Sequence, residues 1–388
     1  MNKKIKLGYD DISIVPATIS TIRHRNECFC YDDNFSLPIF TAPMDQVVDI
    51  ETSEIYMRNG INVVIPRTIP FEDRLKFMLQ SNDNERCFIA VSLTEVQDLF
   101  LETPALNTPF TLIESIRSNL TSGLFTGAYR ICIDIANGHM KELLDTIENI
   151  KKLYGQKVII MSGNIANPKT YDEYERVGCD FVRCSIGSGS RCTTSSNVAV
   201  HYGCFSLLRE IWERKLELRG NCKIVADGGI KGYGDVQKAL LYADYVMIGG
   251  LFNKAIDSAG TPRYGRAYWN IFGKQVINPF KTLLIYGRPV RRRDYSKALK
   301  LIKMGKIDVW KEHYGMSTKI AQSKINPNGK LKTSEGKVQC QKVEYSIKQW
   351  VENEADYLRS AMSYTNSNNL SQYQDSEWVQ LTYKSYNN

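Results

Sequence analysis

The chain has 388 residues, of which 43% are hydrophobic and 24% charged, and its formal net charge is +8. These values are ordinary for a soluble globular protein. No apolar run approaches the roughly 20 residues that a membrane helix needs, and the N-terminus MNKKIKLGYDD lacks the apolar segment of a secretory signal. We therefore expect a cytoplasmic protein with no membrane partner. The mild positive charge suits anionic small ligands, and it does not indicate nucleic acid as a partner.

The ten cysteines are scattered along the chain, at positions 28, 30, 87, 132, 179, 184, 192, 204, 222 and 340. Only Cys28 and Cys30 are close together, and C-x-C without a second pair or nearby histidines is a poor zinc signature. In a reducing compartment free cysteines are usually small buried apolar side chains. We expect that environment for nine of them, and Cys192 is the exception.

Short runs of β-branched and apolar residues recur between helix-like segments. Each is nearly continuous rather than alternating, which is typical of parallel strands buried on both faces. The eight runs are 38–44, 62–67, 87–92, 130–135, 157–163, 180–185, 223–229 and 244–250. Eight such units predict a closed (β/α)8 barrel. An open doubly wound sheet usually has fewer strands and a glycine fingerprint after the first, whereas the first run here ends in APMD.

We expect one barrel domain over residues 1–388, with two long interruptions at about 93–129 and 255–313. The second contains the basic run GRPVRRRDYSK (287–297), and the residues 297–313 that follow resemble a helix. The run is interpreted first as a solvated loop, and alternatively as a contact to a cofactor phosphate or a neighbouring subunit. The tail from about 366 to 388 is polar and rich in asparagine.

Chemistry in such barrels lies at the carboxyl ends of the strands, and polar or glycine residues gather there in this sequence. Glycine pairs at 228–229 and 249–250 follow the seventh and eighth runs, where barrels commonly bind phosphate through backbone amides. Each pair alone also fits a tight turn. Asp227 would repel a phosphate, so we expect its carboxylate to accept hydrogen bonds from ribose hydroxyls. The pattern predicts a nucleotide or sugar phosphate as the ligand.

The loop after the sixth run, IGSGSRCTT (186–194), is the sharpest feature of the sequence. Its small residues give it freedom to move, and Arg191 and exposed amides would lower the pKa of the Cys192 thiol. A thiolate can attack an electrophilic carbon and later leave, which divides one difficult displacement into two easier steps. We therefore predict that Cys192 is a nucleophile.

Taken together, several segments resemble the IMP dehydrogenase/GMP reductase family, in the family's order. They are LGYDDISIVPATIS, TAPMDQVV, GNI, SIGSGSRCTT, ADGGI, GDVQKAL, VMIGG, HYGMS and SEGK. The resemblance covers nearly the whole chain apart from much of 255–305 and the final tail. It implies that Cys192 bonds to C2 of a purine nucleoside monophosphate, that a mobile flap spans about 317–340, and that the protein is a homotetramer.

The resemblance also implies roles for individual residues. Substrate would be bound by Ser190, Asp227, Gly228, Gly229, Gly249, Gly250, the run Tyr314 to Ser317 (with Gly315, Met316 and Ser317), Lys332 and Gly336. The nicotinamide cofactor would contact Arg67, Asp134, Ile135, Ala136, Ile186 and Gly187. Carbonyl groups of Gly187, Gly189 and Cys192 would bind a monovalent cation, usually K+.

Three features favour the reductase over the dehydrogenase. Residues 67–87 leave no room for paired regulatory modules, and no arginine or tyrosine lies between Met316 and Glu335, where dehydrogenases carry a water-activating Arg-Tyr pair. The segments DIANGH and YGMSTKIAQ resemble reductase versions, and by that match Thr194 and Glu335 exchange protons with departing ammonia. We therefore expect NADPH-dependent conversion of GMP to IMP.

Departures from the reductase pattern keep two alternatives open. TAPMD is closer to the dehydrogenase form, Arg67 stands where reductases usually carry lysine, and Lys332 replaces a usual arginine. The alternatives are an NAD-dependent IMP dehydrogenase and a non-catalytic nucleotide-binding homologue. Retention of Cys192, Thr194, Asp227 and Glu335 together argues against the second.

Overall fold

Eight short parallel strands form the centre of the protein in this computed structural model, which describes residues 5–80, 85–101, 110–122, 127–189, 194–271, 274–327 and 329–382. The strands are β2 (Ile39–Thr41), β3 (Val63–Ile65), β4 (Cys87–Val91), β5 (Tyr129–Asp134), β6 (Val158–Ile165), β7 (Phe181–Cys184), β8 (Lys223–Asp227) and β9 (Tyr245–Ile248). Their spatial order is β2-β9-β8-β7-β6-β5-β4-β3. A parallel bridge between Phe40 and Asn62 joins the two ends of that order. The predicted (β/α)8 barrel is thereby confirmed.

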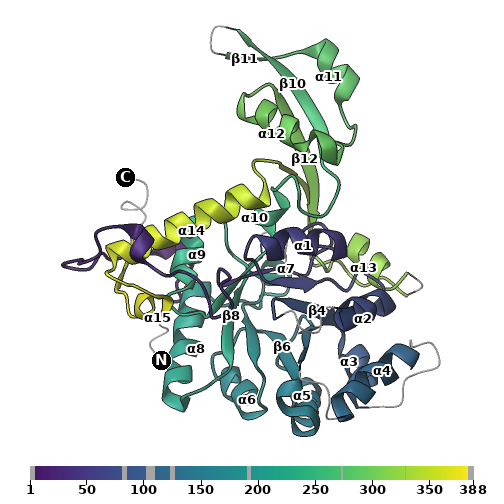
Figure 1. The fold of residues 1–388 in the computed structure, drawn as a ribbon, viewed down its shortest axis with the longest axis vertical. Helices are drawn as coiled ribbons and strands as arrows, with labels where there is room; N and C mark the ends of the chain where they lie inside the picture. The colour runs from purple at the N-terminus through teal and green to yellow at the C-terminus, as the bar shows by residue number, and fades with distance from the viewer. Residues whose placement is uncertain are drawn as a thin grey trace.

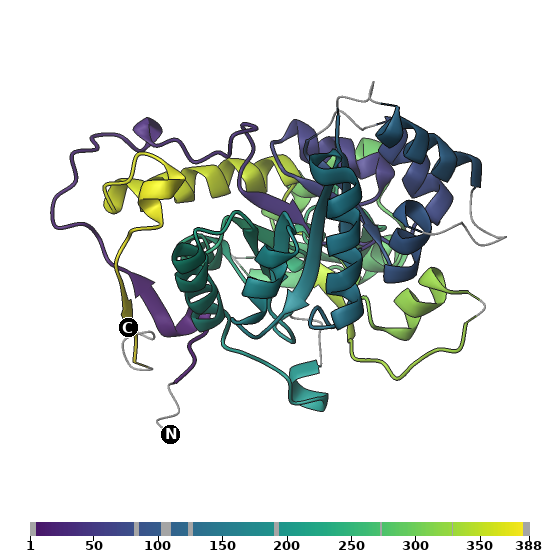
Figure 2. The same ribbon diagram turned by 90° about the horizontal axis from the view of Figure 1, so that it is seen from below.

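Helices surround the barrel because each carries an apolar face that packs against the strands. They are α1 (Ile50–Arg58), α2 (Phe71–Gln80), α3 (Leu93–Phe100), α4 (Phe110–Thr121), α5 (Lys141–Tyr154), α6 (Thr170–Arg176), α8 (Cys204–Leu218), α9 (Tyr233–Ala239) and α14 (Ile347–Tyr364). Both views show this outer layer (Figures 1 and 2). The connection expected at 93–129 contains the two helices α3 and α4.

Aromatic side chains fill part of the barrel interior. Phe40 packs edge-on against Phe88 and Phe181, with ring centroids 5.5 and 5.9 Å apart, and Tyr245 lies 5.1 Å from Phe40. These residues belong to a core cluster inside the strands that is separate from the larger cluster beneath the helices. The interior is therefore a packed core, and ligands are confined to its ends.

The insertion after the eighth strand projects from the barrel as a small unit (Figure 1). It contains β10 (Arg263–Ile271), β11 (Lys274–Ile277), α11 (Pro279–Ile285), the 3-10 helix η4 (Arg292–Asp294), α12 (Tyr295–Lys303) and β12 (Ile307–Tyr314). With β13 (Val338–Lys342) these strands form an antiparallel sheet in the order β11-β10-β12-β13. A separate cluster of buried residues, among them Ala267, Ala298 and Val309, forms its core.

The helix expected over 297–313 is wrong in its second half. Helix α12 ends at Lys303, and Gly305 has a φ of +64°, a left-handed conformation that favours glycine and ends the helix. Residues 307–314 form β12, in which Ile307, Val309 and Lys311 are buried and alternate with more exposed residues. The period of two, rather than 3.6, is the signature of a strand.

The remaining elements lie near the chain ends and the barrel mouth. Strand β1 (Ile12–Ile14) pairs with β14 (Trp378–Gln380), so the tail expected at 366–388 is built into the structure as far as residue 382, with α15 (Leu370–Tyr373) before it. Figure 2 shows this pair on the side away from α13 (Lys319–Ile325). The other short helices are α7 (Thr194–Asn197), α10 (Gly250–Asn253), η1 (Tyr9–Asp11), η2 (Arg25–Glu27) and η3 (Gly155–Lys157). Among the described residues, no helix is long and apolar enough to span a membrane.

Candidate functional site

A buried arginine connects the two acidic residues predicted for the site. Arg183 of β7 donates from Nη1 to Oδ1 of Asp134 at the end of β5, at 2.6 Å. Its Nε and Nη2 donate to Oδ2 of Asp227 at the end of β8, at 3.0 and 2.8 Å. Burial alone would lower the pKa of Arg183, but the neighbouring carboxylates of Asp227 and Asp134 raise it above its ordinary value. The guanidinium therefore stays charged and fixes both carboxylates.

The carboxylate of Asp227 keeps one oxygen for a ligand. Its Oδ2 also accepts from Nδ2 of Asn164 at 2.7 Å, and the same Nδ2 donates to the carbonyl of Ser185 at 2.9 Å. Within the described residues no hydrogen bond uses Oδ1 of Asp227. A carboxylate held on one oxygen and open on the other can accept from a sugar hydroxyl.

Sequence reasoning missed Arg183. A signal was present, because an arginine interrupts the otherwise apolar strand run DFVRCS. Charged residues are almost never fully buried unless they are paired, so an arginine in a buried strand predicts carboxylate partners. Asp227 was already a candidate at the end of the adjacent strand β8, and Asp134 was one at the end of β5, two strands away.

The glycines after β8 and β9 lie where the phosphate was expected. Gly228 and Gly229 have φ values of +93° and +80°, and a Cβ on Gly228 would lie 2.8 Å from Oγ of Ser188. The turn after β8 thus needs glycine both for its conformation and for its close contact with the β7 loop. Gly249 lies beside Met44 and caps the short helix that begins at Gly250.

The loop after β7 packs against its neighbours as far as the structure describes it. The hydroxyls of Ser185 and Ser188 are hydrogen-bonded to each other, and Ser188 Oγ donates to the carbonyl of Asp227 at 3.4 Å. The carbonyl of Ile186 lies 2.9 Å from Nδ1 of His201. Gly187 and Gly189 are half-buried. Ser190 and Cys192 lie outside the described residues.

The other cysteines offer little competition for the role of nucleophile. Eight of the nine cysteines expected to be buried are buried, whereas the expectation is wrong for Cys340, which is exposed on β13. Burial raises the pKa of the Cys132 thiol to about 12 and also raises the pKa of Cys184 and Cys222. Buried thiols with raised pKa values are poor nucleophiles near neutral pH.

The flap brings a carboxylate to the β7 loop. Oγ1 of Thr194, the first residue of α7, donates to Oε2 of Glu335 at 2.6 Å, although the two residues are 141 positions apart. Both side chains are half-buried. A hydroxyl and a carboxylate in such short contact can pass a proton between a reacting group and solvent.

A glutamine in the flap, which sequence reasoning also missed, holds two of the predicted substrate residues. Nε2 of Gln322 donates to the carbonyls of Ser317 at 2.8 Å and Lys332 at 3.3 Å. Its Oε1 accepts from the backbone N–H of Lys332 at 2.7 Å. Gly336 packs against Ser317, since a Cβ there would lie 3.2 Å from the serine Oγ. The two arms of the flap are thereby joined.

A second contact ties the flap to the first barrel loop. Nζ of Lys324 donates to Oδ2 of Asp45 at 2.5 Å and to the hydroxyl of Tyr314 at 2.8 Å. The Tyr314 hydroxyl donates to the same Asp45 oxygen at 2.8 Å. Gly315 and Met316 follow Tyr314 directly and are half-buried.

The end of β3, where cofactor contacts were predicted, carries polar side-chain atoms that lack hydrogen-bond partners within the described residues. Nη1 of Arg67 donates to the backbone carbonyl of Asp134 at 3.0 Å, which places the arginine beside Ile135 and Ala136. Its Nε is buried and has no hydrogen-bond partner among the residues that the structure describes, and the same holds for Oγ1 of Thr68. Buried polar atoms are rarely left unpaired, so this strand end fits a ligand that carries hydrogen-bonding groups.

Comparison with known proteins identifies the scaffold. The family model described as the IMP dehydrogenase / GMP reductase domain matches residues 6–388. The chain belongs to the IMP dehydrogenase/GMP reductase family. It is 30% identical to a GMP reductase of Bacillus licheniformis over 273 residues, which are 68% of this chain and 77% of that protein. It is 29% identical to a GMP reductase of Clostridium acetobutylicum (68% and 76%) and 26% identical to GMP reductase 2 of Bos taurus (70% and 76%).

Membership of this family confirms the resemblance seen in the sequence and the enzyme class, an oxidoreductase.

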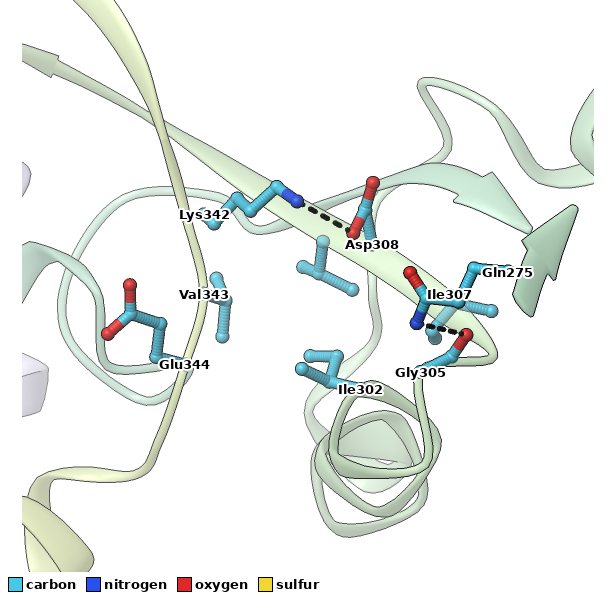
Figure 3. Close-up of a pocket in the computed structure, with 9 residues that line it drawn as sticks. Gln275, Ile302, Gly305, Ile307, Asp308, Lys342, Val343 and Glu344 are labelled. Carbon is cyan, nitrogen blue, oxygen red and sulfur yellow. Dashed lines mark hydrogen bonds and ion pairs between the residues drawn. The ribbon is translucent and has the colours of Figure 1, made fainter. Parts of the chain in front are cut away.

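A cavity of about 230 Å³ lies away from the strand-end site of the barrel, in the insertion between α12, β12 and β13 (Figure 3). Its charged rim residues are already paired, since Lys342 contacts Asp308 at 3.3 Å and Glu344 contacts Lys254 at 3.0 Å. No sequence-predicted site residue lines it.

Proposed function

We propose that this protein catalyses the NADPH-dependent reductive deamination of GMP to IMP and ammonia. The observation that carries the proposal is the 2.6 Å contact between Thr194 Oγ1 and Glu335 Oε2 at the β7 loop. Deamination must protonate a departing amine, and a carboxylate bonded to a hydroxyl supplies a general acid for that step. The names of the relatives, GMP reductases from bacteria and a mammal, support the same reaction.

The nucleotide would bind across the carboxyl ends of the last strands. Backbone amides of Gly228, Gly229, Gly249 and Gly250 suit the 5′-phosphate, as small residues allow close approach of its oxygens. Oδ1 of Asp227 would accept from the ribose hydroxyls. The purine would lie against the remaining candidates, which are Ser190 in the loop and Gly315, Met316, Ser317, Lys332 and Gly336 in the flap.

In the reaction, the Cys192 thiolate would add to C2 of the purine. Glu335, through Thr194, would protonate the 2-amino nitrogen, and the C2–N bond would break to release ammonia. A hydride would then add to C2, and the C–S bond would break to regenerate the thiolate and give IMP. The two steps share one covalent thioimidate. The first step consumes one proton, which leaves with the amine as ammonia, and the second needs no proton, because the expelled thiolate carries the negative charge brought by the hydride.

When bound, NADPH supplies the hydride. The nicotinamide end would be held by Arg67, Asp134, Ile135, Ala136, Ile186 and Gly187. The buried Nε of Arg67 has no partner within the described part of the chain and could donate to an acceptor on that ring. Asp134 is kept in place by Arg183. The backbone carbonyl oxygens of Gly187, Gly189 and Cys192 would bind K+, because carbonyl oxygens are ligands that suit this ion. As in the rest of the family, a homotetramer is the expected assembly.

Oxidation of IMP is less well supported, because that reaction ends in hydrolysis and needs a base that activates water. Residues 317–334 contain neither arginine nor tyrosine, and the tyrosine just before them, Tyr314, is bonded to Asp45 and Lys324.

The test is an assay of the purified protein with GMP and NADPH that follows the nicotinamide absorbance and the release of ammonia. The expected result is one ammonia for each NADPH consumed. Thr194→Ala and Glu335→Gln should each lower kcat by about 100-fold or more, the usual contribution of a general acid. A covalent adduct on Cys192, detected by mass spectrometry and absent in Cys192→Ala, is also expected. Turnover of IMP with NAD, and none of GMP with NADPH, would overturn the proposal.

A further inference from the structure

The outer end of the insertion exposes a run of large apolar side chains. Eight of them lie between residues 269 and 286 and are at least 42% exposed, with Phe280 at 76% and Leu283 at 86%. They come from the hairpin β10–β11 and from α11, which packs on β10. We call this set the apolar tip: Trp269, Ile271, Val276, Ile277, Phe280, Leu283, Leu284 and Tyr286. Exposed apolar groups gathered in one place usually mark an interaction site.

Helix α11 shows that this exposure follows a pattern. Phe280, Leu283 and Leu284 have the i, i+3, i+4 spacing that places side chains on one helical face, and that face points to solvent. The opposite side is attached to the insertion, where Oγ1 of Thr282 accepts from the N–H of Ala267 at 2.9 Å. The helix is therefore firmly held with its apolar face outward.

The same segment is strongly basic. Residues 258–293 include eight lysines and arginines and no aspartate or glutamate. Over 255–313 there are 13 basic and four acidic residues, whereas the rest of the chain has 37 basic and 38 acidic ones. The insertion thus carries all of the protein's net positive charge. Such separation of charge indicates an anionic partner for the insertion alone.

Most of this charge is not neutralised within the protein. Arg292 pairs with Glu51 of α1, but within the described residues the side chains of Lys274, Lys281, Arg291 and Arg293 form no ion pair or hydrogen bond. All four are exposed. The basic run at 287–297 is therefore mainly a solvated surface, as first interpreted, but it adjoins the apolar tip.

We infer that the insertion docks the protein on an anionic lipid surface. Apolar side chains that enter the acyl boundary, flanked by lysine and arginine for anionic headgroups, are what interfacial binding requires. Because the insertion projects from the barrel (Figure 1), its tip can reach a membrane plane while the strand-end site stays in solution. The expectation of no membrane partner rested on the absence of a spanning segment, which surface binding does not need.

Two other occupants fit less well. Nucleic acid stacks on aromatic rings, whereas five of the eight side chains in the apolar tip are aliphatic and offer nothing to a base. A second copy bound tip to tip would bring two segments of the same positive charge together, which opposes association.

The experiment is co-sedimentation of the full chain with vesicles of phosphatidylcholine, with and without about one third phosphatidylserine. The wild-type protein should bind the anionic vesicles at least about tenfold more tightly than the neutral ones, and added salt should weaken this binding. Phe280→Ser/Leu283→Ser/Leu284→Ser should reduce binding about tenfold or more, and Lys281→Gln/Arg291→Gln/Arg293→Gln should remove most of the preference for anionic lipid.

The matched control is Leu153→Ser/Leu216→Ser, which removes leucines that are 63% and 62% exposed on the barrel helices α5 and α8. It should bind vesicles like the wild type, and circular dichroism should show all variants folded. Equal binding of neutral and anionic vesicles, or no effect of the triple serine variant, would overturn the inference. So would binding of polyuridylate without vesicle binding, or a wild-type oligomer that the serine variant dissociates in sedimentation velocity.

Discussion

Arg183 is the residue on which the arrangement of the site depends most. Its guanidinium, 7% exposed, makes three hydrogen bonds to two carboxylates from different strands. Removal of one partner from a buried ion pair is costly because the other charge stays buried without compensation. We expect Arg183→Met to lower the free energy of unfolding by about 3–5 kcal/mol, measured by urea denaturation.

Arg183→Lys keeps the positive charge and should fold better than Arg183→Met. Because lysine cannot bridge two carboxylates as the planar guanidinium does, this variant should still show raised KM values for both GMP and NADPH. Arg176→Met, on the surface of α6, is the control and should change stability by less than about 0.5 kcal/mol. If Arg183→Met is as stable as the control, the buried bridge has no structural role.

Lys311, at the base of the insertion, makes stability depend on pH. Its Nζ donates to the carbonyls of Ala255 and Ser258 and to the Ser258 hydroxyl, at 3.2, 2.9 and 2.5 Å. Burial lowers its pKa to about 7. Between about pH 7 and its unfolded pKa of about 10.4, the unfolded chain binds more protons than the folded one, so stability rises with pH in that window.

We expect the wild type to gain stability over Lys311→Met by up to about 1.4 kcal/mol for each pH unit above 7, in urea titrations at several pH values. Lys300→Met, exposed on α12, should leave the pH dependence of the wild type unchanged. Parallel curves for the wild type and Lys311→Met would show that Lys311 keeps its proton in the folded protein.

At this scale the sequence predicted residues whose type and position are both informative. Asp134, Asp227, Thr194 and Glu335 follow strands or lie in motifs, and the structure brings them together in two pairs: Asp134 with Asp227 through Arg183, and Thr194 with Glu335. Gln322 could not be predicted, because its role is to bond backbone groups of Lys332, ten residues further along the chain. Such contacts depend on how the loop folds back on itself, which no local pattern records.

Among the elements, the flap has its two arms joined by Gln322, which makes three hydrogen bonds to backbone groups of Ser317 and Lys332. Gln322→Ala should lower kcat about tenfold or more, because small errors in the position of catalytic groups are costly, while stability changes by less than about 0.5 kcal/mol. Ser323→Ala removes only a bond within the same helix and is the control. Steady-state kinetics with GMP would contradict this role if both variants matched the wild type.

The elements differ in how well the sequence predicted them. All eight barrel strands were predicted, because strands buried on both faces are continuous apolar runs. The prediction of a helix over the whole of 297–313 was wrong because the helical period of KALKLIKM stops at Gly305. After that residue the buried side chains of Ile307, Val309 and Lys311 alternate with more exposed ones. A buried lysine at one of the inward positions hides the period of two. Only the left-handed φ of Gly305 shows where the change occurs.

On the scale of the whole molecule, the order of the strand-like runs in the sequence predicted the barrel. No sequence pattern predicted the fold of the insertion. Its sheet joins β10 and β12 to β13, which forms the far end of the flap in the sequence. Strand pairing across the flap is a long-range contact, and short alternating segments do not specify their partners. The result is a unit with its own buried core, attached to the barrel near Lys311.

A separate core predicts that the insertion can lose its structure before the barrel does. Ala298 of α12 is 1% exposed within that core, so Ala298→Asp would bury a carboxylate without a partner, at a cost of about 3 kcal/mol or more. We expect trypsin to cleave this variant first within 263–306, where lysines and arginines are frequent, and to leave the barrel intact.

Ser296→Asp, at an exposed position of the same helix, should be cleaved like the wild type. Because β12 ends at Tyr314, just before the flap, and β13 begins at Val338, shortly after Glu335, an insertion that is locally unfolded should also misplace the flap. Ala298→Asp should therefore lose GMP turnover while the barrel keeps its far-ultraviolet circular dichroism. Simultaneous cleavage of barrel and insertion would show instead that the two fold as one cooperative unit.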